Sequence, residues 1–372
     1  MRPAQFLAEY WQKKPLLIRG ACPQILPLFD TRALFALASR DDVESRLVTA
    51  FRGNWRLTAG PFAALPTQKR AWTLLVQGVN LHDARADALM RCFSFLPATR
   101  LDDLMISYAA DGGGVGPHFD SYDVFLLQAS GSRRWRWSAQ RDLALIEGAP
   151  LKLLKNFRPT HAAVLEPGDM LYLPPRYAHD GVAVGACTTC SIGFRAPTWD
   201  ELAQEFLFGL AEREWFKGRY ADAGRRATAA PAEIEARFVD AVADKFQRIR
   251  WTRRDIADFL GRHFSEPKPT VTYERPPAMS RERFVRRATK LGLALSLKTP
   301  MLYHGRRLFV AGESFVPPER NSKILKRFAN ERRIDPETSA TLLDNANCAT
   351  LLHQWWSAGW ITFGRGAGDA VF

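Results

Sequence analysis

The chain has 372 residues, 47% of them hydrophobic, which is enough for one large domain or for two to three smaller domains with sizeable cores. It contains no run of about 18 apolar residues and no apolar core near the N-terminus, so the sequence predicts neither a membrane span nor a signal peptide. Five scattered cysteines favour a reduced, cytoplasmic protein. The 52 Lys and Arg outnumber the 39 Asp and Glu, and the resulting charge of +13 suits acidic or nucleic-acid-rich surroundings without identifying a partner.

The first hundred residues contain patterns of both helices and strands. Pro15 separates a short helix from a following strand. Ala86, Leu89, Met90 and Phe93 recur at helical spacing and predict an amphipathic helix. The predicted helices lie within residues 6–14, 31–39, 41–47 and 82–95, and the predicted strands within residues 16–20, 55–58 and 72–78.

From residue 102 onward the sequence indicates short strands separated by Gly and Pro turns. Gly131 is predicted to make a turn between two of them, and the segment that follows Gly112 is predicted to begin a strand. The other predicted strands lie at residues 104–108, 124–128, 133–137, 164–165, 170–173 and 186–194. Many short strands with such turns are typical of a double-sheet jelly roll of the cupin type, whose open mouth can hold a metal ion.

Three side chains in this region have the pattern of metal ligands. His118 and Asp120 are two residues apart, so on a strand both side chains would point to the same face. His179 follows about 60 residues later, after a predicted strand and a Pro-Pro corner. Two histidines and one carboxylate leave three open positions on an octahedral metal, as in non-haem Fe(II) oxygenases. Zinc accepts the same ligands and would indicate a hydrolase.

Arg133 favours the oxygenase interpretation. Strand alternation places Arg133 on the same inward face as Trp135 and Trp137. An inward guanidinium is costly unless it pairs with an anion, and no acidic residue is near it in sequence. The far carboxylate of 2-oxoglutarate would accept a bidentate contact from it, with the Ser107 hydroxyl as a second donor. A salt bridge to a distant Asp or Glu is the alternative.

After Thr198 the sequence changes to helices. Thr198 and Glu201 have capping-box spacing, and Thr252 is a second candidate helix cap. The apolar stripes of these helices either pack on the barrel or form a dimer bundle. A Pro-rich linker begins at Glu266. Beyond it, helices at residues 280–293, 321–330, 335–344 and 349–358, a hairpin at residues 302–312 and a strand at residues 360–363 predict a winged-helix fold.

Four motifs give the chain a family resemblance. They cover residues 11–20, 112–125, 166–175 and 193–197. Together they resemble the JmjC ribosomal oxygenases, and most of all the bacterial branch that hydroxylates an arginine of large-subunit ribosomal protein sixteen. The resemblance runs through the chain in order. It implies an α+β protein with a JmjC cupin jelly roll (a double-stranded β-helix) at residues 1–197, a helical dimerisation region at 198–265 and a winged-helix domain at 266–372.

The resemblance also implies a set of site residues. Fe(II) would bind His118, Asp120 and His179, and 2-oxoglutarate would chelate that metal and reach Arg133 and Ser107, with dioxygen as the second cosubstrate. Asp111 matches the family position best placed to pair with a substrate guanidinium. Tyr122 and Asp123 are further candidates for the mouth of the site, with a solvated loop as the alternative. The implied protein is a homodimeric, cytoplasmic hydroxylase of a ribosomal protein.

Two other functions are compatible with the sequence. Residues 245–254 and 323–333 are dense in cations, which a nucleic-acid-binding winged-helix protein with a sensory cupin would use, and which predict weak nucleic-acid contact in any case. A metal-dependent cupin isomerase or hydrolase of small molecules is the other alternative. Stimulation by 2-oxoglutarate would separate both from the oxygenase.

Overall fold

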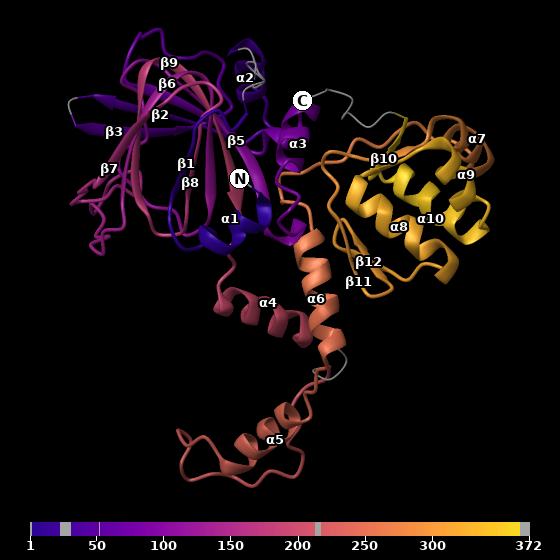
Figure 1. The fold of residues 1–372 in the computed structure, drawn as a ribbon. Coiled ribbons are helices and arrows are strands. Elements are labelled where there is room, and N and C mark those ends of the chain that lie inside the picture. Colours follow the sequence, from indigo (N-terminus) through magenta and orange to yellow (C-terminus); the bar gives the residue numbers. More distant parts are fainter. Residues whose placement is uncertain (1, 23–30, 52, 213–216, 365–372) are drawn as a thin grey trace.

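The structure is a computed structural model that describes residues 2–22, 31–51, 53–212 and 217–364. Figure 1 shows a strand-rich N-terminal domain, a helical segment that projects from it, and a C-terminal domain of helices and short strands. The α+β class and the order of these three parts agree with the sequence prediction. In the part of the chain that is described, no helix combines the length and apolar character needed to cross a membrane.

The N-terminal domain is an antiparallel jelly roll. Its strands pair in the order β1-β8-β6-β9-β5-β4-β2-β3, with β7 paired to β6. The two longest strands, β6 and β9, pair from Val124 with Gly193 to Ser138 with Ala178. The strands are β1 (Leu16–Ile18), β2 (Ser45–Phe51), β3 (Asn54–Ala59), β4 (Trp72–Val76), β5 (Leu101–Ala109), β6 (Val124–Ser138), β7 (His161–Leu165), β8 (Met170–Leu173) and β9 (Ala178–Phe194).

Helices cover one side of the jelly roll. They are α1 (Pro3–Glu9), α2 (Thr31–Ala38) and α3 (Ala84–Arg91), with short 3-10 turns at Val79–Leu81 and Ala98–Arg100. Phe6, Leu34 and Leu89 from the three helices share one core with Phe125 and Tyr172 of the sheet. The predicted helix at residues 41–47 is wrong, because β2 begins at Ser45 and is paired on both edges. Pairing with two neighbours outweighs the local propensity of so short a segment.

The predicted turn at Gly131 is also wrong. Strand β6 continues through this residue, and the register with β9 shifts on both sides of Ser130. Gly131 has a φ of +58°, and a Cβ atom there would lie 2.2 Å from the carbonyl oxygen of Ala186. The glycine therefore permits a bulge that bends one long strand. The bend lets the second half of β6, which carries Arg133, pair with β7 as well as β9.

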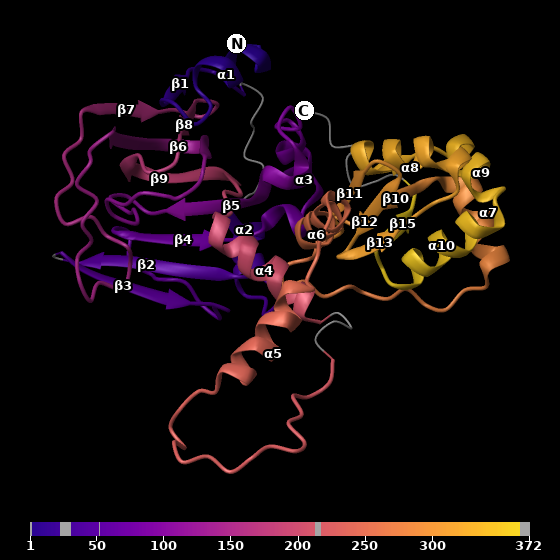
Figure 2. The same cartoon turned by 90° about the horizontal axis from the view of Figure 1, so that it is seen from below.

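Three helices follow the jelly roll: α4 (Trp199–Ala211), α5 (Ala236–Gln247) and α6 (Arg253–Ser265). Capping boxes at Thr198 and Thr252 start α4 and α6, as predicted. Figures 1 and 2 show α5 extending away from both domains. In contrast, α6 packs on the C-terminal domain, where a Cβ atom at Gly261 would lie 2.3 Å from the Phe309 ring.

The C-terminal domain has the helices and the hairpin predicted for a winged-helix fold. Two three-stranded sheets, β14-β10-β15 and β11-β12-β13, accompany its helices. Its core contains the fully buried Phe284, Phe328 and Trp355. The elements are α7 (Arg281–Leu291), β10 (Leu293–Leu295), β11 (Met301–His304), β12 (Arg307–Val310), β13 (Glu313–Phe315), α8 (Glu319–Glu331), β14 (Arg333–Ile334), α9 (Pro336–Leu343), α10 (Ala346–Ser357) and β15 (Ile361–Phe363).

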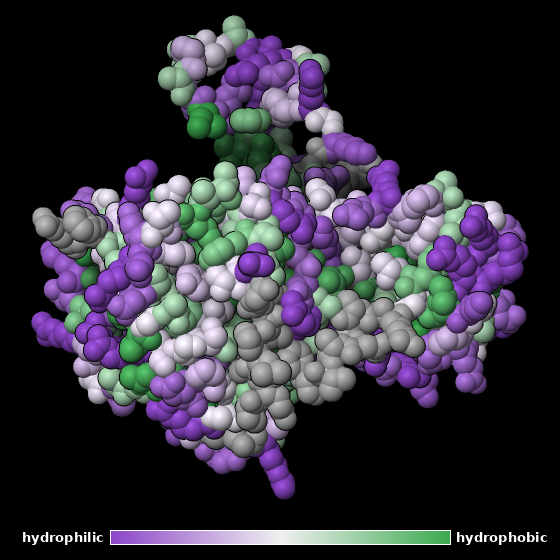
Figure 3. All heavy atoms as spheres, turned by 90° about the horizontal axis from the view of Figure 1, so that it is seen from above, coloured by the Kyte–Doolittle hydropathy of each residue, from purple (hydrophilic) through white to green (hydrophobic). Residues whose placement is uncertain are grey.

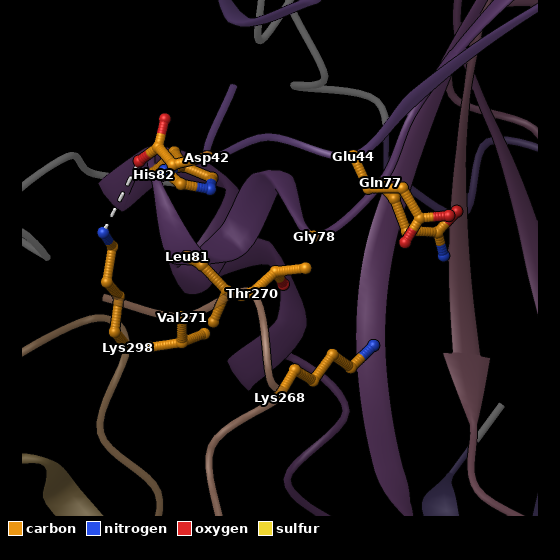
Figure 4. A pocket seen from close by; sticks show the side chains of 10 residues that line it. All are labelled: Asp42, Glu44, Gln77, Gly78, Leu81, His82, Lys268, Thr270, Val271 and Lys298. Carbon is orange, nitrogen blue, oxygen red and sulfur yellow. Dashed lines mark ion pairs between the residues drawn. The ribbon is translucent and has the colours of Figure 1, made fainter. Parts of the chain in front are cut away.

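Ion pairs join the C-terminal domain and its linker to the jelly roll. Lys298 approaches Asp42 to 3.8 Å beside a small pocket lined by residues from both sides of the junction (Figure 4). Lys268 lies 3.1 Å from Asp102. Arg332 lies 3.9 Å from Asp87. In all three pairs the cation follows residue 266 and the carboxylate belongs to the jelly roll, so charge complementarity orients the two domains.

Candidate metal centre

His118 and His179 face each other across a single β-bridge. The backbone N–H of His118 donates to the carbonyl of His179 over 2.9 Å, and the N–H of His179 donates back over 2.8 Å. His179 lies at the start of β9, whereas His118 lies on the loop between β5 and β6. The predicted strand start at His118 and Asp120 is therefore wrong, because His118 forms only this isolated bridge and the strand begins at Val124. The two imidazole ring centroids are 4.2 Å apart.

Asp120 completes a cluster with the two histidines. One ligand atom from each side chain lies within 4.8 Å of the other two, and Asp120 Oδ2 is 3.6 Å from His179 Nε2. His179 is 2% exposed, and the other two side chains are half-buried. The backbone N–H of Arg176 donates to the Asp120 carbonyl over 2.7 Å, which ties this loop to the turn that precedes His179. The three residues predicted as metal ligands are thus brought together.

Backbone carbonyls fix the tautomer of both histidines. Nδ1 of His118 lies 2.9 Å from the Gly116 carbonyl, and Nδ1 of His179 lies 2.9 Å from the Tyr177 carbonyl. A carbonyl only accepts hydrogen bonds, so each Nδ1 carries the proton and each Nε2 keeps its lone pair. Burial, together with the neighbouring His118, lowers the pKa of His179 to about 4. His179 is therefore neutral near pH 7, as a metal ligand must be.

The glycine run before His118 lets the loop pass close to the sheet. A Cβ atom on Gly113 would lie 2.3 Å from the Trp72 carbonyl, and one on Gly114 would lie 2.6 Å from the Gly181 carbonyl. Gly116 has a φ of +78°, and a Cβ atom there would lie 2.5 Å from Leu153. These glycines therefore set the approach of His118 to β9.

Arg133 is buried near this centre with unsatisfied donors. It is 5% exposed, and its Nη1 donates to Ser107 Oγ over 3.4 Å. Its Nε and Nη2 atoms have no hydrogen-bond partner among the described residues, and no carboxylate there forms an ion pair with it. Its guanidinium carbon lies 5.8 Å from the Trp135 ring, which in turn lies 5.9 Å from the His179 ring. A buried cation without a counter-ion favours an anionic ligand. Within the described chain, the alternative that Arg133 forms a salt bridge with a distant Asp or Glu is wrong.

Strand register gives the separation between Arg133 and the three clustered side chains. Trp137 of β6 is paired with His179 of β9, and Arg133 lies four residues further along β6. Four residues of strand span about 13 Å. An arginine side chain and a small dicarboxylate placed end to end can bridge such a separation. Arg133 and Ser107 are thus positioned to hold the far end of an anion that reaches a bound metal.

Trp135 also has an unsatisfied buried donor, which the sequence did not reveal. Its Nε1 lacks a partner among the described residues, although the side chain is 4% exposed. The ring lies against Gly181, where a Cβ atom would be 2.6 Å from it. Strand alternation predicted that this tryptophan faces inward, but alternation says nothing about the partner of an indole N–H.

The three residues predicted to contact a substrate lie in different environments. Asp111 is partly exposed, pairs with Arg70 over 2.9 Å and accepts from the Gly185 backbone N–H over 3.0 Å. Tyr122 is 41% exposed. Burial, followed by the nearby Asp120 carboxylate, raises the pKa of Tyr122, so its phenol stays protonated. Asp111 and Tyr122 therefore remain candidates for substrate contact.

Asp123 is not in the mouth of the site, so that prediction is wrong. It is completely buried and accepts hydrogen bonds from Tyr172 (2.6 Å), Gln12 (3.0 Å) and Arg100 (3.4 Å). The backbone N–H of Gln12 also donates to the Tyr172 hydroxyl over 2.8 Å. Asp123 therefore joins the N-terminal segment to the start of β6. Its position directly before an apolar strand was the one sequence signal of a buried role.

The fold and the site together define a cupin-type metalloprotein joined to a winged-helix domain. A family profile described as the JmjC domain matches residues 88–202, and a profile described as ROXA-like winged helix matches residues 248–362. These comparisons agree with the two domain types that the structure contains.

Individual proteins are similar over longer stretches. The chain is 34% identical over 275 residues to the ribosomal protein uL16 3-hydroxylase of Escherichia coli, which is 73% of each chain. It is 38% identical over 219 residues to a probable ribosomal oxygenase of Haemophilus influenzae, covering 57% of this chain and 54% of that protein. The X-ray structure of E. coli YcfD matches 98% of both chains with a TM-score of 0.86 and 30% identity. A YcfD structure in complex with cobalt and 2-oxoglutarate matches with a TM-score of 0.83. The chain belongs to the JmjC ribosomal oxygenase family.

Proposed function

We propose that this protein is an Fe(II)- and 2-oxoglutarate-dependent hydroxylase of a ribosomal protein, with dioxygen as the second cosubstrate. One observation carries the proposal: the His118, Asp120 and His179 cluster lies in the same barrel as the buried Arg133, whose guanidinium has no carboxylate partner in the described part of the chain. A zinc hydrolase would need the three ligands but has no use for that arginine. A sensory cupin would require neither the three clustered side chains nor a buried arginine in the same barrel.

His118, Asp120 and His179 would hold the ferrous ion, each histidine through the Nε2 atom that its backbone contact leaves free. Arg133 and Ser107 would hold the far carboxylate of 2-oxoglutarate, while its keto-acid end reaches the metal. When bound, the iron and the cosubstrate supply the dioxygen activation that places one oxygen atom on a substrate C–H bond. The chain itself contributes position, because strands β5, β6 and β9 fix these side chains before any ligand binds.

For the substrate, we propose an arginine side chain of large-subunit ribosomal protein sixteen, hydroxylated at carbon 3. The name of the E. coli relative, ribosomal protein uL16 3-hydroxylase, supports this choice. The partly exposed Asp111 carboxylate would then accept from the substrate guanidinium in place of Arg70, which now pairs with it. The Tyr122 phenol would line the same approach as a neutral hydrogen-bonding group. Such a substrate places the activity in the cytoplasm, where ribosomes assemble.

The proposed reaction is tested by mass spectrometry of ribosomal proteins from cells with and without this gene. The intact gene should add about 16 Da, one oxygen atom, to large-subunit protein sixteen, and fragmentation should place it on an arginine. A gene encoding His118→Ala should behave like the deletion, whereas His304→Ala, a change on the exposed C-terminal hairpin, should restore the mass shift. An unshifted protein sixteen in the intact strain would contradict the proposed target.

We further propose that the protein is a homodimer built through α4 and α5. Large apolar side chains on and beside these helices are exposed, among them Trp199 (89%), Phe208 (69%), Ile234 (75%) and Phe246 (57%). A patch of this kind on a monomer usually marks a protein interface. Light scattering after size exclusion should give twice the chain mass of 42.0 kDa, and Phe208→Glu combined with Phe246→Glu should give the single mass. A wild-type protein that elutes as a monomer would contradict the dimer.

A further inference from the structure

The positive charge of the chain is concentrated in one region. Residues 248–362 contain 21 Lys and Arg against 11 Asp and Glu, a net charge of +10 out of the +13 of the whole sequence. This stretch holds α6 and the C-terminal domain. The jelly roll, residues 1–197, has 23 Lys and Arg against 17 Asp and Glu, a charge of +6 over a longer stretch, so most of the excess positive charge lies outside the hydroxylase domain.

Helix α7 presents four of these cations as a stripe. Arg283, Arg286, Arg287 and Lys290 are exposed and follow the spacing i, i+3, i+4 and i+7, which places them along one side of the helix. The first and last are seven residues, or about 10 Å, apart along the axis. In the described part of the chain, no carboxylate lies within ion-pairing distance of any of the four. The opposite side of α7, with Phe284 and Ala288, is fully buried.

Helices α8 and α10 of the same domain do not present a comparable stripe of unpaired cations. On α8, two of the four cations are paired, because Arg327 lies 2.9 Å from Glu331 and Arg320 lies 3.7 Å from Asp344. Helix α10 follows α9 after a tight turn, in the position of a recognition helix, yet its sequence from Ala346 to Ser357 has no Lys or Arg. Its exposed amides, Asn347 and Gln354, are its main polar groups, so it lacks the cations that make the commonest base contacts in the DNA major groove. The arrangement therefore favours phosphate contact by α7 over base recognition by α10.

The stripe of cations on α7 lies away from the jelly roll, so a partner can bind it without covering the proposed active site. Figures 1 and 2 both place α7 at the end of the C-terminal domain that is farthest from the jelly roll. Hydrophilic residues dominate this end of the molecule in Figure 3. A partner that binds there would leave the metal centre open. An acidic lipid surface fits less well, because a membrane-binding helix needs a free apolar face and that of α7 is buried in the core.

We propose that α7 is a sequence-independent binding surface for the phosphate backbone of structured RNA, and this inference rests on the proposed function for its choice of RNA. A ribosomal protein that contacts RNA is itself basic, so an enzyme with a charge of +13 repels it when it is free. Bound to ribosomal RNA, the same substrate presents a polyanion that attracts the enzyme. Contact through α7 then raises the local concentration of the substrate at the jelly roll.

The test compares two triple variants of the full-length protein in binding to a labelled RNA hairpin of about 20 base pairs, followed by fluorescence anisotropy across a range of salt concentrations. The α7 variant carries Arg283→Gln, Arg286→Gln and Lys290→Gln, and leaves Arg287, whose guanidinium stacks on Phe363, in place. The control carries Arg32→Gln, Lys69→Gln and Arg141→Gln, which removes the same charge from exposed positions of the jelly roll.

We expect the α7 variant to lose at least about tenfold in affinity near 0.1 M salt and to reduce the slope of log K against log salt by about 2 to 3, since each phosphate contact contributes about 0.9. The control should stay within about twofold of the wild type. Equal losses in both variants would overturn the proposal, because net charge alone would then explain binding. Tighter binding to a DNA duplex of the same length, or to phosphatidylserine vesicles, would overturn it as well.

The proposed hydroxylase activity and RNA binding can fail separately. RNA binding is measured without iron or 2-oxoglutarate, so an inactive protein that binds RNA through α7 would uphold this inference and refute the hydroxylase. The α7 variant should hydroxylate a short free peptide of large-subunit protein sixteen at the wild-type rate. A reduced rate on that peptide would show that α7 acts on the jelly roll itself and would overturn the assignment of α7 to RNA.

Discussion

Arg133 and Arg136 lie on the same strand, yet among the described residues only the more exposed one has a carboxylate partner. Arg136, whose side chain is 40% exposed, pairs with Asp180 over 2.5 Å. Arg133, which is 5% exposed, has the Ser107 hydroxyl at 3.4 Å as its hydrogen-bond acceptor. Burying a charge without a counter-ion costs several kcal/mol, so a chain optimised for stability alone would pair the inner arginine first. The inner charge is placed for a ligand.

Replacing Arg133 by methionine should separate ligand binding from stability. Without the guanidinium, the loss of charge-assisted contacts should weaken 2-oxoglutarate binding about a hundredfold, which is ~2.7 kcal/mol. The metal-loaded but ligand-free variant should be at least as stable as the wild type, because an uncompensated buried charge is gone. Calorimetric titration of 2-oxoglutarate into Mn(II)-loaded protein measures the first effect, and urea denaturation the second.

Arg134→Met provides the matched control for that experiment. Arg134 is the neighbouring residue, is exposed and points to the other face of the strand. The control should bind 2-oxoglutarate with wild-type affinity. Undiminished affinity in Arg133→Met would show that the cosubstrate is held elsewhere.

Loss of one predicted metal ligand should sharply weaken metal binding without unfolding the protein. His179→Ala leaves two ligands, and we expect metal affinity to fall by at least about a hundredfold, more than the loss of an outer contact causes. Turnover of 2-oxoglutarate should vanish with it, and circular dichroism should stay unchanged. Chelation of the wild type should have the same effect, reversed by Fe(II) but not by Zn(II), which fits the ligands but lacks the redox chemistry. Full turnover with zinc alone would contradict the oxygenase.

A methyl group added to a glycine of the loop that carries His118 should disturb the metal centre. A Cβ atom on Gly114 would lie 2.6 Å from the Gly181 carbonyl, and this backbone contact leaves no side chain to move aside. Gly114→Ala should therefore displace His118 and lower metal affinity at least about tenfold, with a smaller effect on the free energy of unfolding. Gly209→Ala on α4, far from the metal centre and with no atom of the same chain near the added methyl group, should keep metal affinity. Metal titration of both variants checks this contrast.

Local sequence pattern was enough to predict the three clustered side chains and the inward-facing Arg133. The positions of other residues, such as Asp123, depend on contacts with residues far away in the sequence. The period of two along a strand correctly turned Arg133 and Trp135 inward, because alternation depends on the backbone alone. Asp123 lies next to the metal-binding loop in sequence, but its buried position depends on Tyr172 and Gln12, which are 49 and 111 residues away. No local pattern contains that information.

Gly131 illustrates a second limit of the sequence. A positive φ angle is needed both in a hairpin turn and in a bulge, so the residue type does not distinguish them. The choice depends on whether the flanking segments pair with each other or with a third strand. Here both flanks pair with β9, and the chain continues as one strand. The same reasoning applies to Ser45, where pairing of β2 with β3 and β4 replaced a predicted helix.

Asp169 should make stability depend on pH through the anchoring of strand β1. It accepts hydrogen bonds from the backbone N–H groups of Glu166 (3.0 Å) and Gly20 (2.9 Å) and from Arg19 (2.5 Å). Burial alone would raise the pKa of Asp169, but these donors together hold it below the ordinary value of 3.8. A carboxylate with a lowered pKa in the folded state contributes stability above pH 3.8 and loses it as the pH falls through the folded pKa.

Asp169→Asn should therefore destabilise the protein by about 2 kcal/mol at pH 7, because weaker acceptors replace a charged one. The difference from the wild type should be unchanged at about pH 5.5 and should shrink below pH 3.8, where the wild-type carboxylate begins to take up its proton. Urea denaturation at several pH values measures it, with Asp41→Asn, an exposed aspartate, as the control that should show no such trend. A difference that grows as the pH falls would mean that the pKa of Asp169 is raised in the folded protein, contrary to the hydrogen bonds that surround it.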